Sequence, residues 1–159
     1  MAGAYYLAVS GGSGSGYHNL GSNVPISAYV PAGYAFSHWG GLNAGSVHDV
    51  NAANTYITVS GNQSITAIFT HVLYYVNYRA NAGGSISSGG SQSSYYGNYL
   101  APATAAADPG YHFTGWNDGN QNLTRQDVCY GNYTYTASFE ANTPPGPDGS
   151  TLPGNIIWM

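Results

Sequence analysis

The chain has 159 residues, of which 43% are hydrophobic and 5% are charged, and its formal net charge at pH 7 is −4. Because Arg79 and Arg125 are its only basic residues besides histidine, we expect no basic patch that neutralises nucleic-acid phosphates. No apolar run reaches the roughly 20 residues of a membrane-spanning helix, so we expect no membrane insertion. The hydrophobic content predicts a folded chain with a core.

The first half of the sequence predicts short β-strands separated by turns. In chain order, we expect strands over 6–9, 24–29, 34–39 and 65–69. A stretch of glycine and serine over 10–16 supplies the first turn. Tyr34, Phe36 and His38 follow the period of two that is typical of half-buried strands. The loop over 43–55 is compatible with one short helical turn.

The second half predicts the same succession of elements. Strands are expected over 75–78, 101–107, 111–116 and 135–139, with a glycine-rich turn over 83–91. Alanine favours helix on propensity alone over 101–107, but Pro102 and the following Asp-Pro-Gly turn leave too little room for a stable helix. We therefore predict a strand there.

An internal repeat relates the two halves. Residues 33–39 (Gly-Tyr-Ala-Phe-Ser-His-Trp) match 110–116 (Gly-Tyr-His-Phe-Thr-Gly-Trp) at a constant offset of 77. The closing strands match at an offset of 70, so seven residues are missing from the second loop. We expect each tryptophan to follow a register change and to close a core. The predicted core residues are Tyr34, Phe36, Trp39, Phe69, Tyr111, Phe113, Trp116 and Phe139.

The repeat predicts a mainly β fold made of two tandem modules, over 1–71 and 72–141. Residues 142–159 begin with a proline- and glycine-rich linker, which is incompatible with a helix or the interior of a sheet. The linker is followed by a short apolar tail that contains Ile156, Ile157 and Trp158. We expect these three residues to pack on a neighbouring subunit, and the alternative is a tail folded back on its own domain.

Candidate catalytic and metal-binding groups do not form a recognisable site in the sequence. Asp108 and Asp118 lie in turns where an Asx side chain bonds its own backbone. The segment that starts at Asp118 resembles a calcium loop, but Leu123 and Cys129 stand where the loop requires glycine and glutamate. The five histidines lack zinc-type spacing, and Cys129 is the only cysteine, so no disulfide forms within the chain. We expect no enzymatic activity, metal or cofactor.

Both halves resemble one known family. Residues 110–119, 124–127 and 134–139 closely resemble the bacterial InlB B-repeat family, and residues 31–39, 51–53 and 66–69 are similar to its divergent branch. The resemblance covers about residues 5–140. It implies small β-grasp-like modules of surface adhesins, cell-wall proteins and phage structural proteins, without catalytic residues. The sequence departs from the pattern at His38, which stands where the second unit has Gly115, and in its scarcity of charge.

These observations predict a non-enzymatic structural or assembly protein of a virion surface, fibre or extracellular filament. Its expected partners are other copies of itself or other surface or virion proteins. The alternatives are a cell-surface adhesin module and an accessory carbohydrate-binding module, with a glycan as the ligand. Tyr95, Tyr96 and Tyr99 are the candidate binding residues, because tyrosine offers a rigid apolar ring and one hydroxyl.

Overall fold

The computed structural model describes residues 3–145, and the chain divides into two compact units between Val72 and Leu73. Sequence analysis placed this boundary between residues 71 and 72. The linker and tail predicted over 142–159 lie mostly outside the described residues, and the residues Ile156, Ile157 and Trp158 lie wholly outside them.

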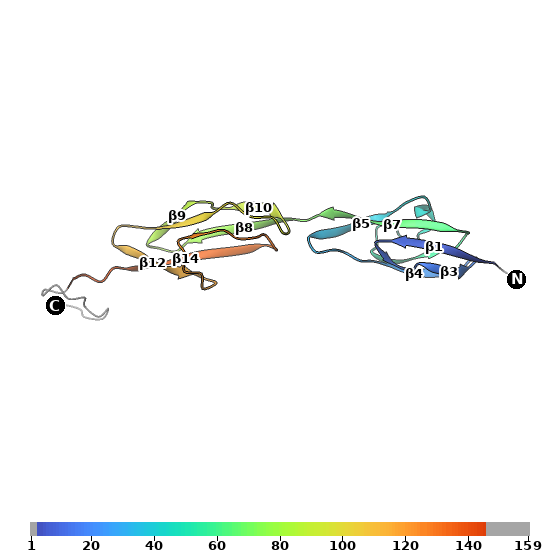
Figure 1. Ribbon diagram of the computed structural model, residues 1–159, viewed down its shortest axis with the longest axis horizontal. Helices are drawn as coiled ribbons and strands as arrows, with labels where there is room; N and C mark the ends of the chain where they lie inside the picture. Colours follow the sequence, from blue (N-terminus) through green and yellow to red (C-terminus); the bar gives the residue numbers. More distant parts are fainter. Residues whose placement is uncertain (1–2, 146–159) are drawn as a thin grey trace. The chain divides into compact units, whose positions relative to one another are not determined.

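The first unit contains seven strands and one short 3₁₀ helix, η1. Its elements are β1 (Ala4–Ser10), β2 (Gly12–Ser13), β3 (Gly16–Asn19), β4 (Asn23–Ala28), β5 (Tyr34–Gly40), η1 (Ala44–Ser46), β6 (Asn54–Thr58) and β7 (Gln63–His71) (Figure 1). One sheet has the order β3-β1-β7-β5, and a smaller sheet has the order β2-β4-β6. The first strand, β1, runs parallel to the last strand, β7, and the other pairings are antiparallel.

The second unit repeats this topology. Its strands are β8 (Leu73–Ala80), β9 (Gly84–Ser88), β10 (Gln92–Tyr95), β11 (Ala103–Ala107), β12 (Tyr111–Trp116), β13 (Thr124–Arg125) and β14 (Tyr133–Ala141) (Figure 1). The sheets have the orders β10-β8-β14-β12 and β13-β11-β9, with β8 parallel to β14. The prediction of a mainly β chain with two tandem halves is confirmed, and the alanine-rich segment is the strand β11. The likeness to a β-grasp stays a prediction, and residues 3–145 contain no α-helix.

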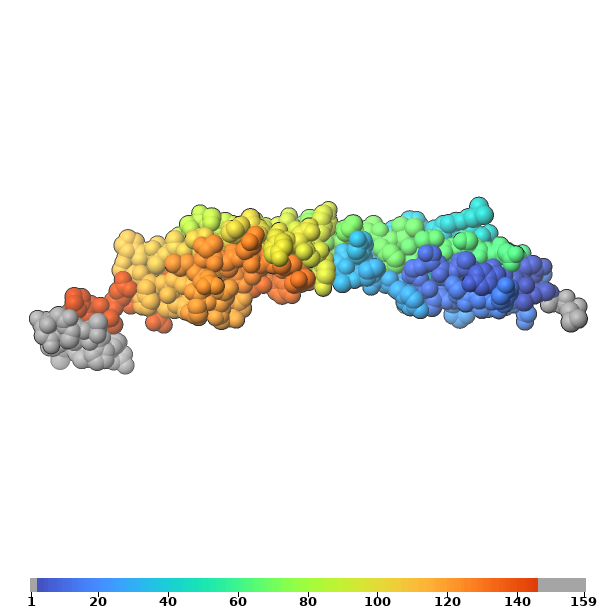
Figure 2. Space-filling view, in the orientation of Figure 1, coloured from blue at the N-terminus to red at the C-terminus, as the bar shows by residue number. Residues whose placement is uncertain are grey.

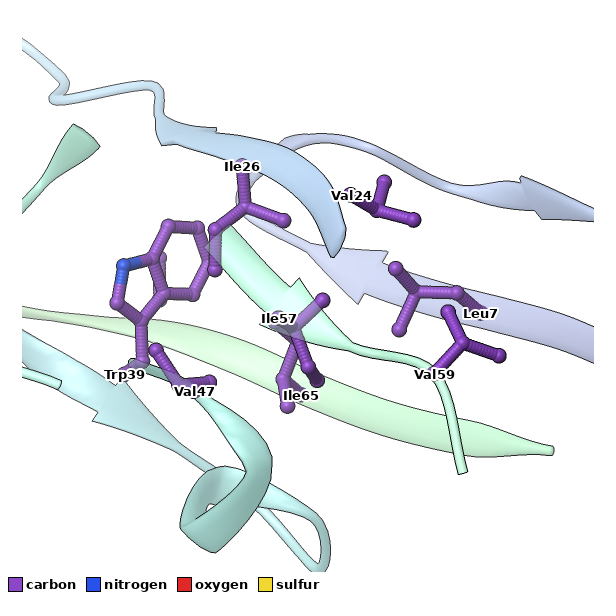
Figure 3. Close-up of a cluster of buried hydrophobic side chains, with 9 residues drawn as sticks. Leu7, Val24, Ile26, Trp39, Val47, Ile57, Val59 and Ile65 are labelled. Atoms are coloured by element: carbon purple, nitrogen blue, oxygen red, sulfur yellow. The ribbon is translucent and has the colours of Figure 1, made fainter. Parts of the chain in front are cut away.

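Each unit has its own hydrophobic core. In the first unit the core side chains converge between the two sheets, as Figure 3 shows. They are Leu7, Val24, Ile26, Trp39, Val47, Ile57, Val59, Ile65 and Ala67. The second core is built from smaller side chains and more aromatic ones, namely Val76, Tyr78, Leu100, Ala103, Ala105, Trp116, Cys129 and Ala137.

A β-bulge in the aromatic strand of each unit places the tryptophan in the core. In β5, Phe36 pairs with Phe69 and His38 pairs with the adjacent Ile68, so that Ser37 is an extra residue. Because the bulge shifts the alternation of side chains by one residue, Trp39 lies on the same face as Phe36, and their ring centroids are 5.6 Å apart. Trp39 is 1% exposed, and its indole Nε1–H donates to the carbonyl oxygen of Ala52 at 3.0 Å.

The second unit has its bulge at the equivalent place, in β12. Phe113 pairs with Phe139, and Gly115 pairs with the preceding residue of β14, Ser138, so Thr114 is the extra residue. Trp116 is 4% exposed, and its Nε1–H donates to the carbonyl oxygen of Asn122 at 2.8 Å. Gly115 has a φ of 137°, a conformation that favours glycine.

The core prediction was wrong for Tyr34 and Tyr111, which are 37% and 41% exposed. Each tyrosine shares a face with the phenylalanine two residues later, but it occupies the first position of its strand, in the last pair of the ladder. At this position the ring of Tyr34 lies against His71, its partner in the ladder, at 4.3 Å between centroids. The four phenylalanines of the prediction are partly buried against the two cores: Phe36, Phe69, Phe113 and Phe139.

The tryptophans give a stability prediction. Replacing Trp39 or Trp116 with alanine removes a buried ring from a small core, and we expect a loss of about 3–5 kcal/mol in the free energy of unfolding of that unit. Hydrogen exchange read on peptides from each unit measures the loss. Leu42 is 94% exposed, so Leu42→Ala is the control, with an expected change within about 0.5 kcal/mol. Equal effects of Trp39→Ala and Leu42→Ala would contradict the assigned core.

Candidate functional site

Two short segments of the second unit pair side by side at its surface, over residues 95–100 and 127–131. The backbone N–H of Gly97 donates to the carbonyl oxygen of Cys129 at 2.7 Å, and the N–H of Cys129 donates to that of Asn98 at 2.9 Å. The N–H of Leu100 donates to the carbonyl oxygen of Asp127 at 2.9 Å. Tyr99 and Val128 form an antiparallel bridge between the two segments, next to the antiparallel ladder of β11 with β13. The buried Cys129 and Leu100 anchor the segments in the core. The first of these segments, yellow in Figure 2, lies on the visible surface.

Four tyrosines project from this pair of segments, and we call them the tyrosine tip. They are Tyr95, Tyr96, Tyr99 and Tyr130, with exposed fractions of 46%, 42%, 75% and 55%. The rings of Tyr96 and Tyr130 meet edge to face, with centroids 5.2 Å apart and planes at 63°. The three tyrosines predicted from the sequence therefore lie on one pair of segments, joined by Tyr130, which sequence analysis missed.

The first unit forms the same backbone arrangement. There the N–H of Gly21 donates to the carbonyl oxygen of Val59 at 2.7 Å, and the N–H of Val59 donates to that of Ser22 at 2.9 Å. These two bonds correspond to the bonds that link Gly97, Cys129 and Asn98 in the second unit. Gly21 and Gly97 also share a positive φ, 79° and 83°, which favours glycine in both turns.

This correspondence shows that the fold does not require the tyrosines. The equivalents of Tyr95, Tyr96, Tyr99 and Tyr130 in the first unit are Asn19, Leu20, Asn23 and Ser60. The same backbone thus forms with no aromatic residue at any of the four positions. Exposed aromatic side chains that the fold does not need are typical of a binding surface.

A second difference between the two units is a buried cation in the second one. Arg125 is 5% exposed, and its guanidinium donates to both carboxylate oxygens of Asp118 and to both of Asp127, at 2.7–2.9 Å. The guanidinium also lies over two aromatic rings, 3.9 Å from the centroid of Tyr135 and 5.2 Å from that of Trp116. The hydroxyl of Tyr78 donates to Asp127 at 2.8 Å.

This network takes the place of aliphatic packing. By register, the first-unit equivalents of Arg125 and Asp127 are Thr55 and Ile57, and Ile57 is fully buried. Burial in the second core raises the pKa of Tyr78 above its usual range, and the hydrogen bond to Asp127 raises it further. The hydrogen bond from Arg125 lowers the pKa of Asp118.

The charged groups of this network are bonded to one another and to the backbone. Both carboxylates bind the guanidinium, and the side chain of Asp118 also accepts from the N–H of Asn120 at 3.2 Å, as predicted for an Asx turn. Over residues 3–145 the structure contains no group of three or more histidine, cysteine, aspartate or glutamate side chains placed to hold a metal ion. It also contains, over the same residues, no helix long and apolar enough to cross a membrane.

The repeat and the fold agree with a family assignment. The model of the divergent InlB B-repeat domain matches residues 5–73 and again residues 74–143. The chain belongs to the divergent InlB B-repeat family. This family of repeat domains is associated with extracellular and cell-surface proteins. No curated protein and no solved structure matches the chain.

The buried cation of this B-repeat gives a second stability prediction. Arg125→Thr leaves the partly buried carboxylate of Asp127 without its cation, and we expect a loss of up to about 3 kcal/mol in the second unit. The double variant Arg125→Thr/Asp127→Ile restores the pair of residues that the first unit uses, so we expect it to be more stable than Arg125→Thr alone. Urea unfolding followed by the indole NMR signals of Trp39 and Trp116 separates the two units. If the loss in the double variant equals the sum of the losses in the two single variants, the two residues are not coupled and the prediction is wrong.

The same network predicts a difference between the units in acid. The pKa of Asp118 is lower in the folded state than in the unfolded chain, so its stabilising effect is present above the unfolded pKa of about 3.9 and disappears as the pH falls through the folded value. We therefore expect the second unit to unfold at lower urea concentrations once the pH is lowered below about 4. Asp118→Asn is the control, and it should reduce this fall. A midpoint unchanged down to about pH 2 would contradict the prediction.

Proposed function

We propose that this B-repeat protein is a non-enzymatic structural protein of a virion surface, fibre or extracellular filament, and that the tyrosine tip contacts other proteins. Its partners are other copies of the chain or other surface or virion proteins. The observation that carries the proposal is the difference between the two units. The pair of segments bears four exposed tyrosines in the second unit, and the equivalent positions of the first unit hold none.

The chemistry of the tip supports a protein partner. Tyrosine rings bury apolar area at small cost in side-chain entropy, and their hydroxyls still form hydrogen bonds, so they recur as anchors in protein interfaces. The nearest carboxylate along these segments is that of Asp127, which already pairs with Arg125. A partner that covers the tip therefore removes no unpaired charge from water.

The geometry of the rings gives protein contacts the advantage over sugar stacking. Tyr96 and Tyr130 do not offer a sugar one flat aromatic platform, because the planes of their rings are 63° apart. The alternative function is an adhesin or accessory carbohydrate-binding module with a glycan as ligand. The observation that favours it is the 75% exposure of Tyr99, which leaves a single ring open for stacking.

An exchange of residues between the units tests the proposal. In the tip variant Tyr95→Asn, Tyr96→Leu, Tyr99→Asn and Tyr130→Ser are combined, so that every new residue already occupies the equivalent backbone position in the first unit. We expect the wild-type chain to self-associate in sedimentation velocity at increasing concentration, and the tip variant to remain a monomer with unchanged hydrogen exchange in its core. If the tip forms the interface, removing its four tyrosines should lower the association constant at least tenfold.

The matched control comes from the first unit. Tyr17 is 75% exposed, and Tyr17→Ser introduces the residue that stands at the equivalent position, Ser93, so self-association should not change. Equal association of the wild-type chain and the tip variant would rule out the tip as the interface. A wild-type chain that stays monomeric but binds a glycan array, with binding lost in Tyr99→Ala, would instead support the alternative.

A further inference from the structure

Both units contain a pair of exposed tyrosines whose rings are in contact. Tyr6 on β1 lies directly opposite Tyr17 on β3, with ring centroids 5.1 Å apart, and Tyr96 and Tyr130 of the tyrosine tip are 5.2 Å apart. The exposed fractions of the four side chains range from 42% to 75%. Both phenols of each pair are therefore open to a small oxidant while they remain side by side.

We propose that Tyr6 with Tyr17, and Tyr96 with Tyr130, are sites of dityrosine cross-linking by hydrogen peroxide and a haem peroxidase. Each phenol loses one electron and one proton and becomes a tyrosyl radical. The two radicals form a carbon–carbon bond between ring carbons ortho to the hydroxyls, and both rings regain aromaticity by tautomerisation. The pair loses two hydrogen atoms in total, and these reduce one hydrogen peroxide to two molecules of water.

The backbone keeps each pair together long enough for the radicals to combine. Tyr6 and Tyr17 form a cross-strand pair in the β1 and β3 ladder. In the tip, the two hydrogen bonds between residues 97–98 and Cys129 hold the segments that carry Tyr96 and Tyr130. Exposed rings change rotamer within nanoseconds, so the ortho carbons meet without any movement of the strands. The coupling takes place within one chain and requires no second copy and no surface partner, so it is independent of the assembly proposed above.

A third close pair provides the contrast within the molecule. The rings of Tyr78 and Tyr135 stack at 5.5 Å, but Tyr78 is 4% exposed and its hydroxyl donates to Asp127. The guanidinium of Arg125 covers the other ring. Oxidation that follows accessibility should spare this pair, whereas oxidation that follows ring distance alone should not.

The position of the two arginines makes the reaction in the tip directly measurable. Because Arg79 and Arg125 are the only sites for trypsin, the enzyme releases residues 1–79, 80–125 and 126–159, and Tyr96 and Tyr130 fall on different fragments. The full chain is oxidised while dilute, the monomer is isolated by size exclusion, and the unfolded monomer is digested. We expect mass spectrometry to find the second and third fragments joined with the loss of two hydrogens. Tyr96→Phe should abolish this product and Tyr99→Phe should preserve it.

The pair in the first unit has a separate readout. Both Tyr6 and Tyr17 lie on the fragment over 1–79, so this fragment should show dityrosine fluorescence. Tyr17→Phe should remove that fluorescence, whereas Tyr29→Phe, which changes another exposed tyrosine, should retain it. The proposal would be overturned if the oxidised monomer gave no joined second and third fragments and no dityrosine fluorescence in the first fragment. A cross-link located by fragmentation at Tyr78 and Tyr135 would overturn it as well.

Discussion

The parallel pairing of the first and last strands is the constraint on which each unit depends. In the first unit it joins residues such as Leu7 and Gln63, which lie near the two ends of that unit's sequence. The edge strands β3 and β5 then pair on either side of this central pair. An asparagine side chain extends this pairing by one residue. Asn62 accepts from the backbone N–H of Tyr6 at 2.9 Å, and Asn132 accepts from that of Tyr75 at 2.8 Å. Both bonds satisfy a backbone donor that the ladder leaves open.

Once this frame is in place, the two units fill their interiors by different means. The first uses branched aliphatic residues such as Ile57 and Ile65, which gain stability by leaving water. In the second, alanines line the core, and a guanidinium held by two carboxylates and two aromatic rings fills the remaining space. A buried ion pair gains little over apolar packing but is costly to break, so the second core depends on charged groups that the first core lacks.

The sequence predicted the strands and the repeat because alternation, glycine-rich turns and the tryptophan motif are local signals. It did not predict that Tyr34 and Tyr111 are exposed, because a period of two assigns a face but not the extent of the covering sheet. The clustering of Arg125 with Asp118 depends on a contact between separate strands and loops, which no spacing encodes. Tyr130 was missed for the same reason, since only the pairing of residues 95–100 with 127–131 brings it beside Tyr96.

The duplication also separates what the fold requires from what it permits. The positive φ of Gly21 and Gly97 and the side-chain bonds of Asn62 and Asn132 recur in both units, so they belong to the architecture. The tyrosine tip occurs in one unit, on a backbone that forms equally well with Asn19, Leu20, Asn23 and Ser60. Since exposed tyrosines add little to the stability of a turn, their concentration at one of two equivalent places indicates a function that folding alone does not explain.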